Sequence, residues 1–124
     1  MMLNVAPILV ADDDPDIRAL VSAVLRAAGY VVVPARDGEE ALALAAVHEL
    51  GAAVLDVFMP RVGGFEVCRT LRDGKATSAL PIVLLSARGE PDDFARGYEE
   101  GASRYMSKPF RPRELVAAVN ELVS

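Results

Sequence analysis

The chain has 124 residues and a mass of 13.2 kDa, the usual size of one compact domain, and we expect a single domain over residues 5–124. Its 18 acidic and 13 basic residues give a net charge of −5, which disfavours direct binding to nucleic acid. The single cysteine, Cys68, excludes an internal disulfide and a cysteine-rich metal centre. The sequence shows neither a signal peptide nor an apolar run long enough to span a membrane, so we expect no membrane association and a cytoplasmic location.

Five short apolar segments, rich in β-branched and aliphatic residues, are predicted to form strands. Each is too short for a helix, and most are apolar at consecutive positions. This pattern is typical of strands in a parallel sheet that is covered on both faces by helices. The predicted strands are Ile8–Ala11, Val31–Val33, Ala52–Leu55, Ile82–Leu85 and Tyr105–Met106.

Helical patterns separate these strands. Asp14 is predicted to cap the first helix, Pro15 suits its first turn, and Gly29 ends it. The remaining helices are predicted over residues 37–47, over residues 65–72, from Pro91 to Gly101, and from Pro112 onward. A strand followed by a helix, repeated five times, predicts an α/β fold: a doubly wound, five-stranded parallel sheet in a three-layer sandwich.

Polar residues gather where the predicted strands end. Asp12 and Asp13 follow the first strand, Asp56 the third, Ser86 the fourth and Lys108 the fifth. In an open parallel sheet, ligands bind outside the carboxyl ends of the strands, where the winding of the chain reverses direction. The sequence therefore predicts one site built from these five side chains.

The charges at this site need compensation. Two carboxylates about 5 Å apart repel by roughly 3 kcal/mol at an effective dielectric constant near 20. Lys108 offsets part of this repulsion, and a hard divalent cation such as Mg²⁺, which prefers oxygen ligands, would offset the rest. The pattern therefore predicts a magnesium site, and such a site has open coordination positions that phosphate oxygens fill well. Asp14 is predicted only to cap its helix.

Five motifs, spread from about Pro7 to Val123, together resemble the receiver domain of two-component response regulators. They are Asp12-Asp13 after ILVA, Asp56 with VFMP after it, Ser86-Ala87 after PIVLL, Tyr105, and Lys108-Pro109-Phe110. The resemblance implies a flavodoxin-like (βα)5 fold and a cis peptide bond between Lys108 and Pro109.

The resemblance also implies a reaction. Asp56 would accept a phosphoryl group from a histidine kinase, a phosphotransfer protein or a small phosphodonor. Asp13, Asp56 and the backbone carbonyl of Phe58 would coordinate Mg²⁺, and Asp12 would act mainly through metal-bound water. The chain would then be a signalling switch rather than an enzyme.

The remaining motif residues would bind the phosphoryl group and report its presence. The resemblance implies that Ser86, Ala87 and Lys108 bind phosphoryl oxygens, and that Asp56, Ser86 and Lys108 carry out the transfer. Ser86 and Tyr105 would form the switch, which changes the surface of the fourth helix, fifth strand and fifth helix. A downstream target or an output domain would read that surface.

Two alternatives stay open at this point. Phosphatases of the haloacid dehalogenase type also use an aspartate nucleophile and Mg²⁺, but they place a general acid two residues after the nucleophile, where this chain has Phe58. A phosphate sink or docking receiver without output is the second alternative. Relatives that dimerise through the last three elements usually carry acids where this chain has Ser103 and Arg104, so the sequence does not favour that dimer.

Overall fold

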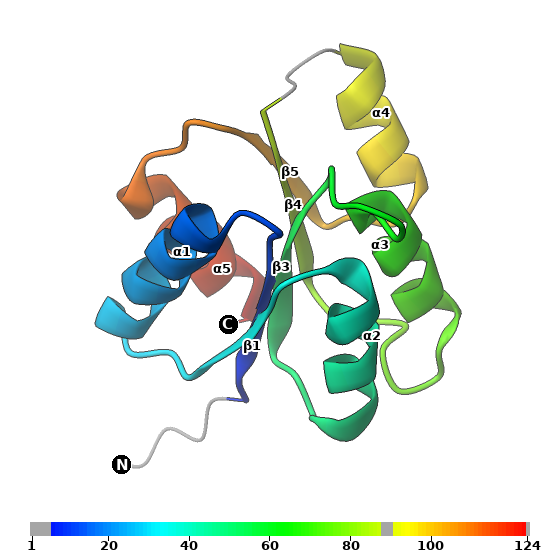
Figure 1. Ribbon diagram of the computed structural model, residues 1–124, viewed down its shortest axis with the longest axis horizontal. Coiled ribbons are helices and arrows are strands. Elements are labelled where there is room, and N and C mark those ends of the chain that lie inside the picture. Colours follow the sequence, from blue (N-terminus) through cyan, green and yellow to red (C-terminus); the bar gives the residue numbers. More distant parts are fainter. Residues whose placement is uncertain (1–5, 88–90, 124) are drawn as a thin grey trace.

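Strands and helices alternate along the whole described chain in a computed structural model that covers residues 6–87 and 91–123 (Figure 1). The two ends of the predicted domain, residues 5 and 124, lie outside the described residues. The strands are β1 Ile8–Ala11, β2 Val32–Ala35, β3 Ala52–Asp56, β4 Ile82–Ser86 and β5 Arg104–Ser107. The helices are α1 Pro15–Ala27, α2 Gly38–Val47, α3 Gly64–Asp73, α4 Pro91–Glu99 and α5 Pro112–Val123.

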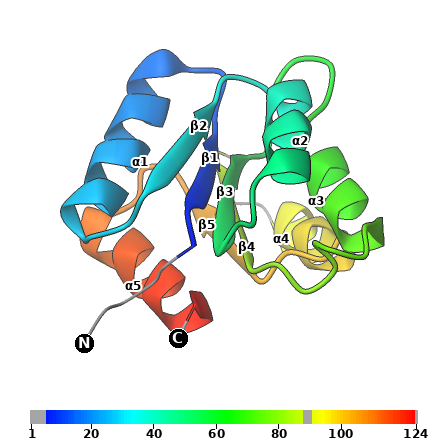
Figure 2. The same ribbon diagram turned by 90° about the horizontal axis from the view of Figure 1, so that it is seen from below.

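All five strands are parallel and lie in one sheet in the order β2-β1-β3-β4-β5. Helices α1 and α5 cover one face, and α2, α3 and α4 cover the other (Figures 1 and 2). This arrangement confirms the predicted α/β class and the three layers. Because the chain moves outward from β1 to β2 and then returns to the other side of β1 to form β3, its winding reverses between β1 and β3. The carboxyl ends of these two strands therefore flank the expected ligand position.

The two hydrophobic cores lie on opposite faces of the sheet, one under α2, α3 and α4 and the other under α1 and α5. Strands β1, β3 and β4 are buried at every position, as their consecutive apolar residues predict. Strands β2 and β5 are only partly buried. The expectation of burial on both faces therefore holds for the three central strands and is wrong for the two edge strands.

The predicted bounds of β2 are also wrong. The strand runs from Val32 to Ala35, and Val31 lies outside it with 63% of its surface exposed. The carbonyls of Val31 and Ala35 accept hydrogen bonds from the N–H groups at the start of β1 (Ile8, 2.8 Å) and directly after it (Asp12, 3.2 Å). Since backbone groups alternate in direction along a strand, Pro34 faces away from β1. A proline is tolerated there because its missing N–H leaves no ladder bond unmade.

β1 has the predicted bounds, and the other strand and helix ends either agree with the predicted ones or differ from them by one or two residues. Strands β3 and β4 each extend by one residue, so that Asp56 and Ser86 are the last residues of their strands. Asp37 is the N-cap of α2 rather than its first residue, and its side chain accepts a hydrogen bond from the Glu40 N–H. No helix in the described part of the chain is long and apolar enough to cross a membrane.

Candidate functional site

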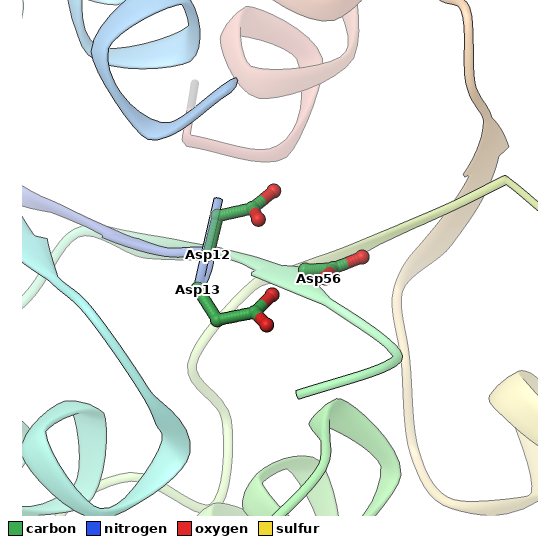
Figure 3. A group of neighbouring side chains, drawn as sticks. All are labelled: Asp12, Asp13 and Asp56. Atoms are coloured by element: carbon green, nitrogen blue, oxygen red, sulfur yellow. The ribbon is translucent and has the colours of Figure 1, made fainter. Parts of the chain in front are cut away.

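Three carboxylates meet at the reversal point of the sheet. Asp12 and Asp13 follow β1, and Asp56 ends the neighbouring strand β3; Figure 3 shows their side chains pointing to the same side. One oxygen atom from each carboxylate lies within 4.8 Å of the others. Asp12 and Asp56 are 3% and 7% exposed, whereas Asp13 is exposed to solvent. The structure thus brings the predicted acids together, and their role as metal ligands stays a prediction.

The consecutive acids that precede α1 make different contacts. Asp14 caps the helix, because its carboxylate accepts hydrogen bonds from the N–H groups of Asp16 and Ile17 at 2.9 and 3.4 Å. The Asp12 carboxylate accepts a hydrogen bond from the Asp14 N–H at 3.0 Å, and the Arg18 guanidinium donates to the Asp12 carbonyl at 2.8 Å. Asp14 is therefore a cap, as predicted, and the first turns of α1 fix the orientation of Asp12.

Lys108 joins two of the three acids. Its Nζ donates to Asp12 Oδ2 at 3.0 Å and to Asp56 Oδ1 at 3.1 Å. Burial alone lowers the pKa of Lys108, but the hydrogen bonds and charges of Asp12 and Asp56 outweigh burial and raise that pKa above its usual value. One ammonium against three ionised carboxylates leaves a formal charge of −2 (1 − 3), which a single divalent cation would cancel. The predicted cis bond between Lys108 and Pro109 is present.

Asp56 is the most perturbed of the acids. Burial raises its pKa to about 6, and the negative charges of Asp12 and Asp13 add to this effect, whereas Lys108 opposes it. A carboxylate must be ionised to act as a nucleophile. Cations that approach this site would therefore both lower the pKa of Asp56 and increase its reactive fraction.

The pKa of Asp56 predicts how stability depends on pH in the absence of metal. Because the folded chain holds the Asp56 proton up to about pH 6 and the unfolded chain loses it near pH 4, folding is opposed increasingly as the pH rises through this window. We expect the unfolding free energy of wild type, relative to Asp56→Asn, to fall by about 2 kcal/mol between pH 4 and pH 7. Urea unfolding of both proteins in EDTA measures the difference, and a difference that is constant with pH would contradict it.

Ser86 and Lys108 are joined through the backbone. Ser86 is fully buried and pairs with Ser107 across β4 and β5, and the Lys108 N–H donates to the Ser86 carbonyl at 2.6 Å. Ala87 follows at the exposed end of β4. Tyr105 is buried against α4, with 6% of its surface exposed. The structure places Ser86, Ala87 and Lys108 at one edge of the sheet, while their phosphate-binding and switch roles stay predictions.

A cleft of about 470 Å³ opens beside the acid cluster. Asp13 lines it, together with the β3–α3 loop and residues of α3 and α4, among them Phe58, Phe65 and Arg96. Phe58, two residues after Asp56, is 47% exposed. The Arg96 guanidinium lies over the Phe65 ring, 4.5 Å from its centroid, and so connects α4 with α3 at this cleft.

Gly64 is a site residue that the motifs do not identify. A Cβ atom at this position would lie 2.4 Å from the Asp56 carbonyl oxygen and 2.9 Å from Val57 Cα. The Gly64 N–H donates to the Val57 carbonyl at 2.8 Å. Helix α3 therefore begins directly against the backbone that presents Asp56. The glycine pair Gly63-Gly64 after the Met-Pro turn is the only trace of this contact in the sequence.

Known proteins are similar to this chain in sequence and in fold. A family model described as "Response regulator receiver domain" matches residues 8–120. The chain is 44% identical over 116 residues to the alkaline phosphatase synthesis transcriptional regulatory protein PhoP of Bacillus subtilis, covering 94% of this chain and 48% of PhoP. It is 41% identical over 116 residues to the DNA-binding dual master transcriptional regulator RpaA of Synechocystis, covering 94% and 48%. The chain spans about half the length of these regulators.

Solved structures agree with this assignment. The chemotaxis protein CheY4 of Vibrio cholerae superposes with a TM-score of 0.91 at 34% identity, over 96% of this chain and 99% of that one. The family match covers β1 through most of α5, and thus every element of the sheet and every candidate site residue. The chain therefore belongs to the receiver domains of two-component response regulators, a family that signals by phosphorylation.

Proposed function

We propose that Asp56 accepts a phosphoryl group, in a reaction that depends on Mg²⁺, from a histidine kinase, a phosphotransfer protein or a small phosphodonor in the cytoplasm. One observation carries the proposal: a buried carboxylate at the reversal point of the sheet lies within reach of one lysine and two further acids. The motifs and the family membership support it.

The residues at this site fit a magnesium ion. Asp12, Asp13, Asp56 and the backbone carbonyl of Phe58 would hold it, with Asp12 acting mainly through water, and this set offers only the oxygen ligands that Mg²⁺ prefers. When bound, Mg²⁺ supplies positive charge that neutralises the phosphoryl oxygens. The proposal thus gives a reason for three acids to lie together beside a single lysine.

In the transfer itself, an Asp56 carboxylate oxygen forms a bond to phosphorus while the bond from phosphorus to the donor breaks. The electron pair of the broken bond leaves with the donor. Lys108 has three N–H donors, of which two now bind carboxylates, so its third can bind a phosphoryl oxygen. The Ser86 hydroxyl and the Ala87 N–H would bind the other oxygens. Water later attacks phosphorus, the bond between phosphorus and the Asp56 oxygen breaks, and inorganic phosphate leaves, which restores the Asp56 carboxylate.

The phosphoryl group would change the surface formed by α4, β5 and α5, which we call the α4–β5–α5 face. Movement of Ser86 and Lys108 toward the new charge pulls on β5 through the hydrogen bond between them, and Tyr105 lies on that strand. The active packing becomes more populated as a result. We propose that a downstream target or an output domain binds this face, and that the acidic chain itself does not contact nucleic acid.

Residues that could support dimerisation through this face are engaged within the chain. The Arg104 guanidinium pairs with the Glu121 carboxylate of α5 at 2.7 Å. The Ser103 hydroxyl accepts a hydrogen bond from the Ile82 N–H at 3.0 Å. Like the sequence, these contacts do not favour the dimer typical of relatives with acids at these two positions.

The phosphatase alternative lacks its general acid. The residue two positions after Asp56 is Phe58, whose side chain cannot donate a proton to a leaving group. The matched relatives carry names of regulators rather than of enzymes. Signalling is therefore the better supported proposal.

Intact-mass measurement after incubation with acetyl phosphate tests the proposed function. We expect wild type to gain one phosphoryl group in millimolar Mg²⁺ and none when EDTA is present. The mass should return to its starting value as the acyl phosphate hydrolyses. An unchanged mass at Mg²⁺ concentrations that saturate the protein would reject Asp56 as a phosphoacceptor.

Phe58 should determine how long the phosphoryl group lasts. Its half-exposed ring stands two residues from Asp56 and beside Asp13, where it can hinder the approach of water to phosphorus. We expect Phe58→Ala to lose its phosphoryl group about fivefold faster than wild type, equal to roughly 1 kcal/mol of activation free energy. Leu20→Ala, which removes a similarly exposed apolar side chain (48%) from α1, is the matched control and should dephosphorylate at the wild-type rate.

A further inference from the structure

A glycine in the last turns of α4 receives the ring of Tyr105. Gly97 is the only buried residue of this helix. A Cβ atom at this position would lie 2.5 Å from Tyr105 Cδ2, 3.1 Å from Cε2 and 3.4 Å from Leu84 Cδ1. The tyrosine ring thus lies against bare helix backbone. We call this contact surface at Gly97 the notch.

Neighbouring residues of α4 complete the surroundings of Tyr105. The Phe94 ring meets the Tyr105 ring edge to face, with 4.5 Å between centroids and 68° between planes. The Tyr105 N–H donates to the Tyr98 hydroxyl oxygen at 3.3 Å. Phe94 and Gly97 therefore contact the ring and Tyr98 holds the backbone of the same residue, all from one helix. The notch provides the space that a side chain would otherwise fill.

The α4 helix cannot easily move away from the ring. At its C-terminal end, the Arg69 guanidinium of α3 pairs with the Glu100 carboxylate at 2.6 Å. The Arg72 guanidinium donates to the Gly101 carbonyl at 2.8 Å and to the Leu80 carbonyl at 2.6 Å. These contacts hold the end of α4 close to the notch. A side chain added at residue 97 would accordingly displace the Tyr105 ring rather than the helix.

Helix stability alone does not explain the glycine. Glycine weakens a helix relative to alanine, and α4 has only nine residues. The close contact with Tyr105 provides a reason for glycine here, because it is the only residue type that lets the ring lie inward.

We propose that Gly97 is a positioning residue: its notch holds Tyr105 inward and thereby sets how strongly the phosphoryl site is coupled to the α4–β5–α5 face. This inference rests on the proposed function. Tyr105 lies on β5, three residues before Lys108, and the Lys108 N–H that follows this strand is hydrogen-bonded to Ser86. A movement of β5 therefore changes both the position of the Tyr105 ring and the geometry of the phosphoryl site. A phosphoryl mimic that favours the inward position of the Tyr105 ring binds more tightly when the ring is inward. Because such coupling is reciprocal, a substitution that moves the ring outward must weaken binding of the mimic.

The test compares Gly97→Ala with wild type and repeats the comparison in a Tyr105→Ala background. Tyrosine-labelled NMR reports the Tyr105 ring, with Tyr30, which bonds Asn120 at the far side of the protein, as the internal control. Gly97→Ala should shift the Tyr105 signal toward that of an exposed ring and lower the unfolding temperature. In the Tyr105→Ala background the same substitution should raise the unfolding temperature, because only the better helix propensity of alanine remains.

Beryllofluoride with Mg²⁺ is the probe for the phosphoryl site. We expect Gly97→Ala to bind it about fivefold more weakly than wild type, at the lower end of typical coupling between sites. The Tyr105→Ala protein should bind it equally well with either residue at position 97. These binding differences would not follow from a merely structural role of the notch.

Each other outcome is decisive. If the Tyr105 signal does not move, or if Gly97→Ala shifts the unfolding temperature in the same direction in both backgrounds, the notch at Gly97 does not hold the Tyr105 ring. A displaced ring with unchanged beryllofluoride affinity overturns the coupling. If wild type itself binds no beryllofluoride, the proposed function fails, and the coupling that rests on it fails too, while the NMR signal and the temperature shifts still decide whether the notch exists.

Discussion

Replacing Asp56 with asparagine is expected to abolish phosphorylation and to make the metal-free protein more stable. The amide keeps the shape of the side chain but provides no carboxylate nucleophile. It also removes a buried negative charge whose pKa of about 6 lies roughly 2 units above its usual value, equal to about 3 kcal/mol. Lys108 loses one of its two negatively charged partners, which reduces the gain. We expect the unfolding free energy at pH 7.5 to rise by about 2 kcal/mol.

Intact mass and urea unfolding in EDTA measure the two effects on the same protein. Asp73→Asn, an exposed substitution at the end of α3, changes the net charge equally and should leave both quantities unaltered. Phosphorylation that persists in Asp56→Asn would mean that another residue is the acceptor. A less stable variant would mean that the hydrogen bond between Lys108 and Asp56 outweighs the cost of burying the charge.

Removal of Asp13 is expected to eliminate the stabilisation by Mg²⁺. In wild type, the proposed ion would relieve repulsion that exists only in the folded chain, so a tenfold excess of Mg²⁺ over its dissociation constant should add about 1.4 kcal/mol to the unfolding free energy. For a chain of this length we expect the unfolding temperature to rise by about 4 °C. Asp13→Ala should show no such rise and should be at least as stable as wild type without metal, because one of three repelling charges is gone.

The matched control is Asp16→Ala, which removes another exposed acid four residues downstream of Asp12 on α1. This variant should keep the full response to Mg²⁺ in a thermal scan. A wild-type protein that is indifferent to millimolar Mg²⁺, or an Asp13→Ala variant that responds as strongly as wild type, would contradict the metal site described above.

The sequence alone predicts much of the fold and most of the site. Each strand end is a local feature: Asp12 and Asp13 directly follow an apolar run, as does Asp56, and a parallel sheet places such ends on one edge. Topology then brings residues far apart in the chain together without further information. The ion pairs of Lys108 with Asp12 and Asp56 follow from charge balance at that edge.

Contacts that depend on close approach between distant segments were not predictable. The contact between Gly64 and the Asp56 carbonyl, and the one between Gly97 and Tyr105, involve a missing side chain, which leaves no hydrophobic or charge pattern to detect. The bounds of β2 were predicted wrongly for a different reason. A proline ends a predicted strand, but at the edge of a sheet it is tolerated, and edge position is a property of the assembled fold.

The outward-facing Pro34 has a consequence for association between molecules. The open edge of a sheet offers unpaired backbone groups to which a strand of another molecule can add. Strand β2 is such an edge, and the proline presents a ring and no N–H in the middle of it. An incoming strand would lack a donor at that position and meet a steric obstacle. This edge therefore resists the addition of a strand from another molecule.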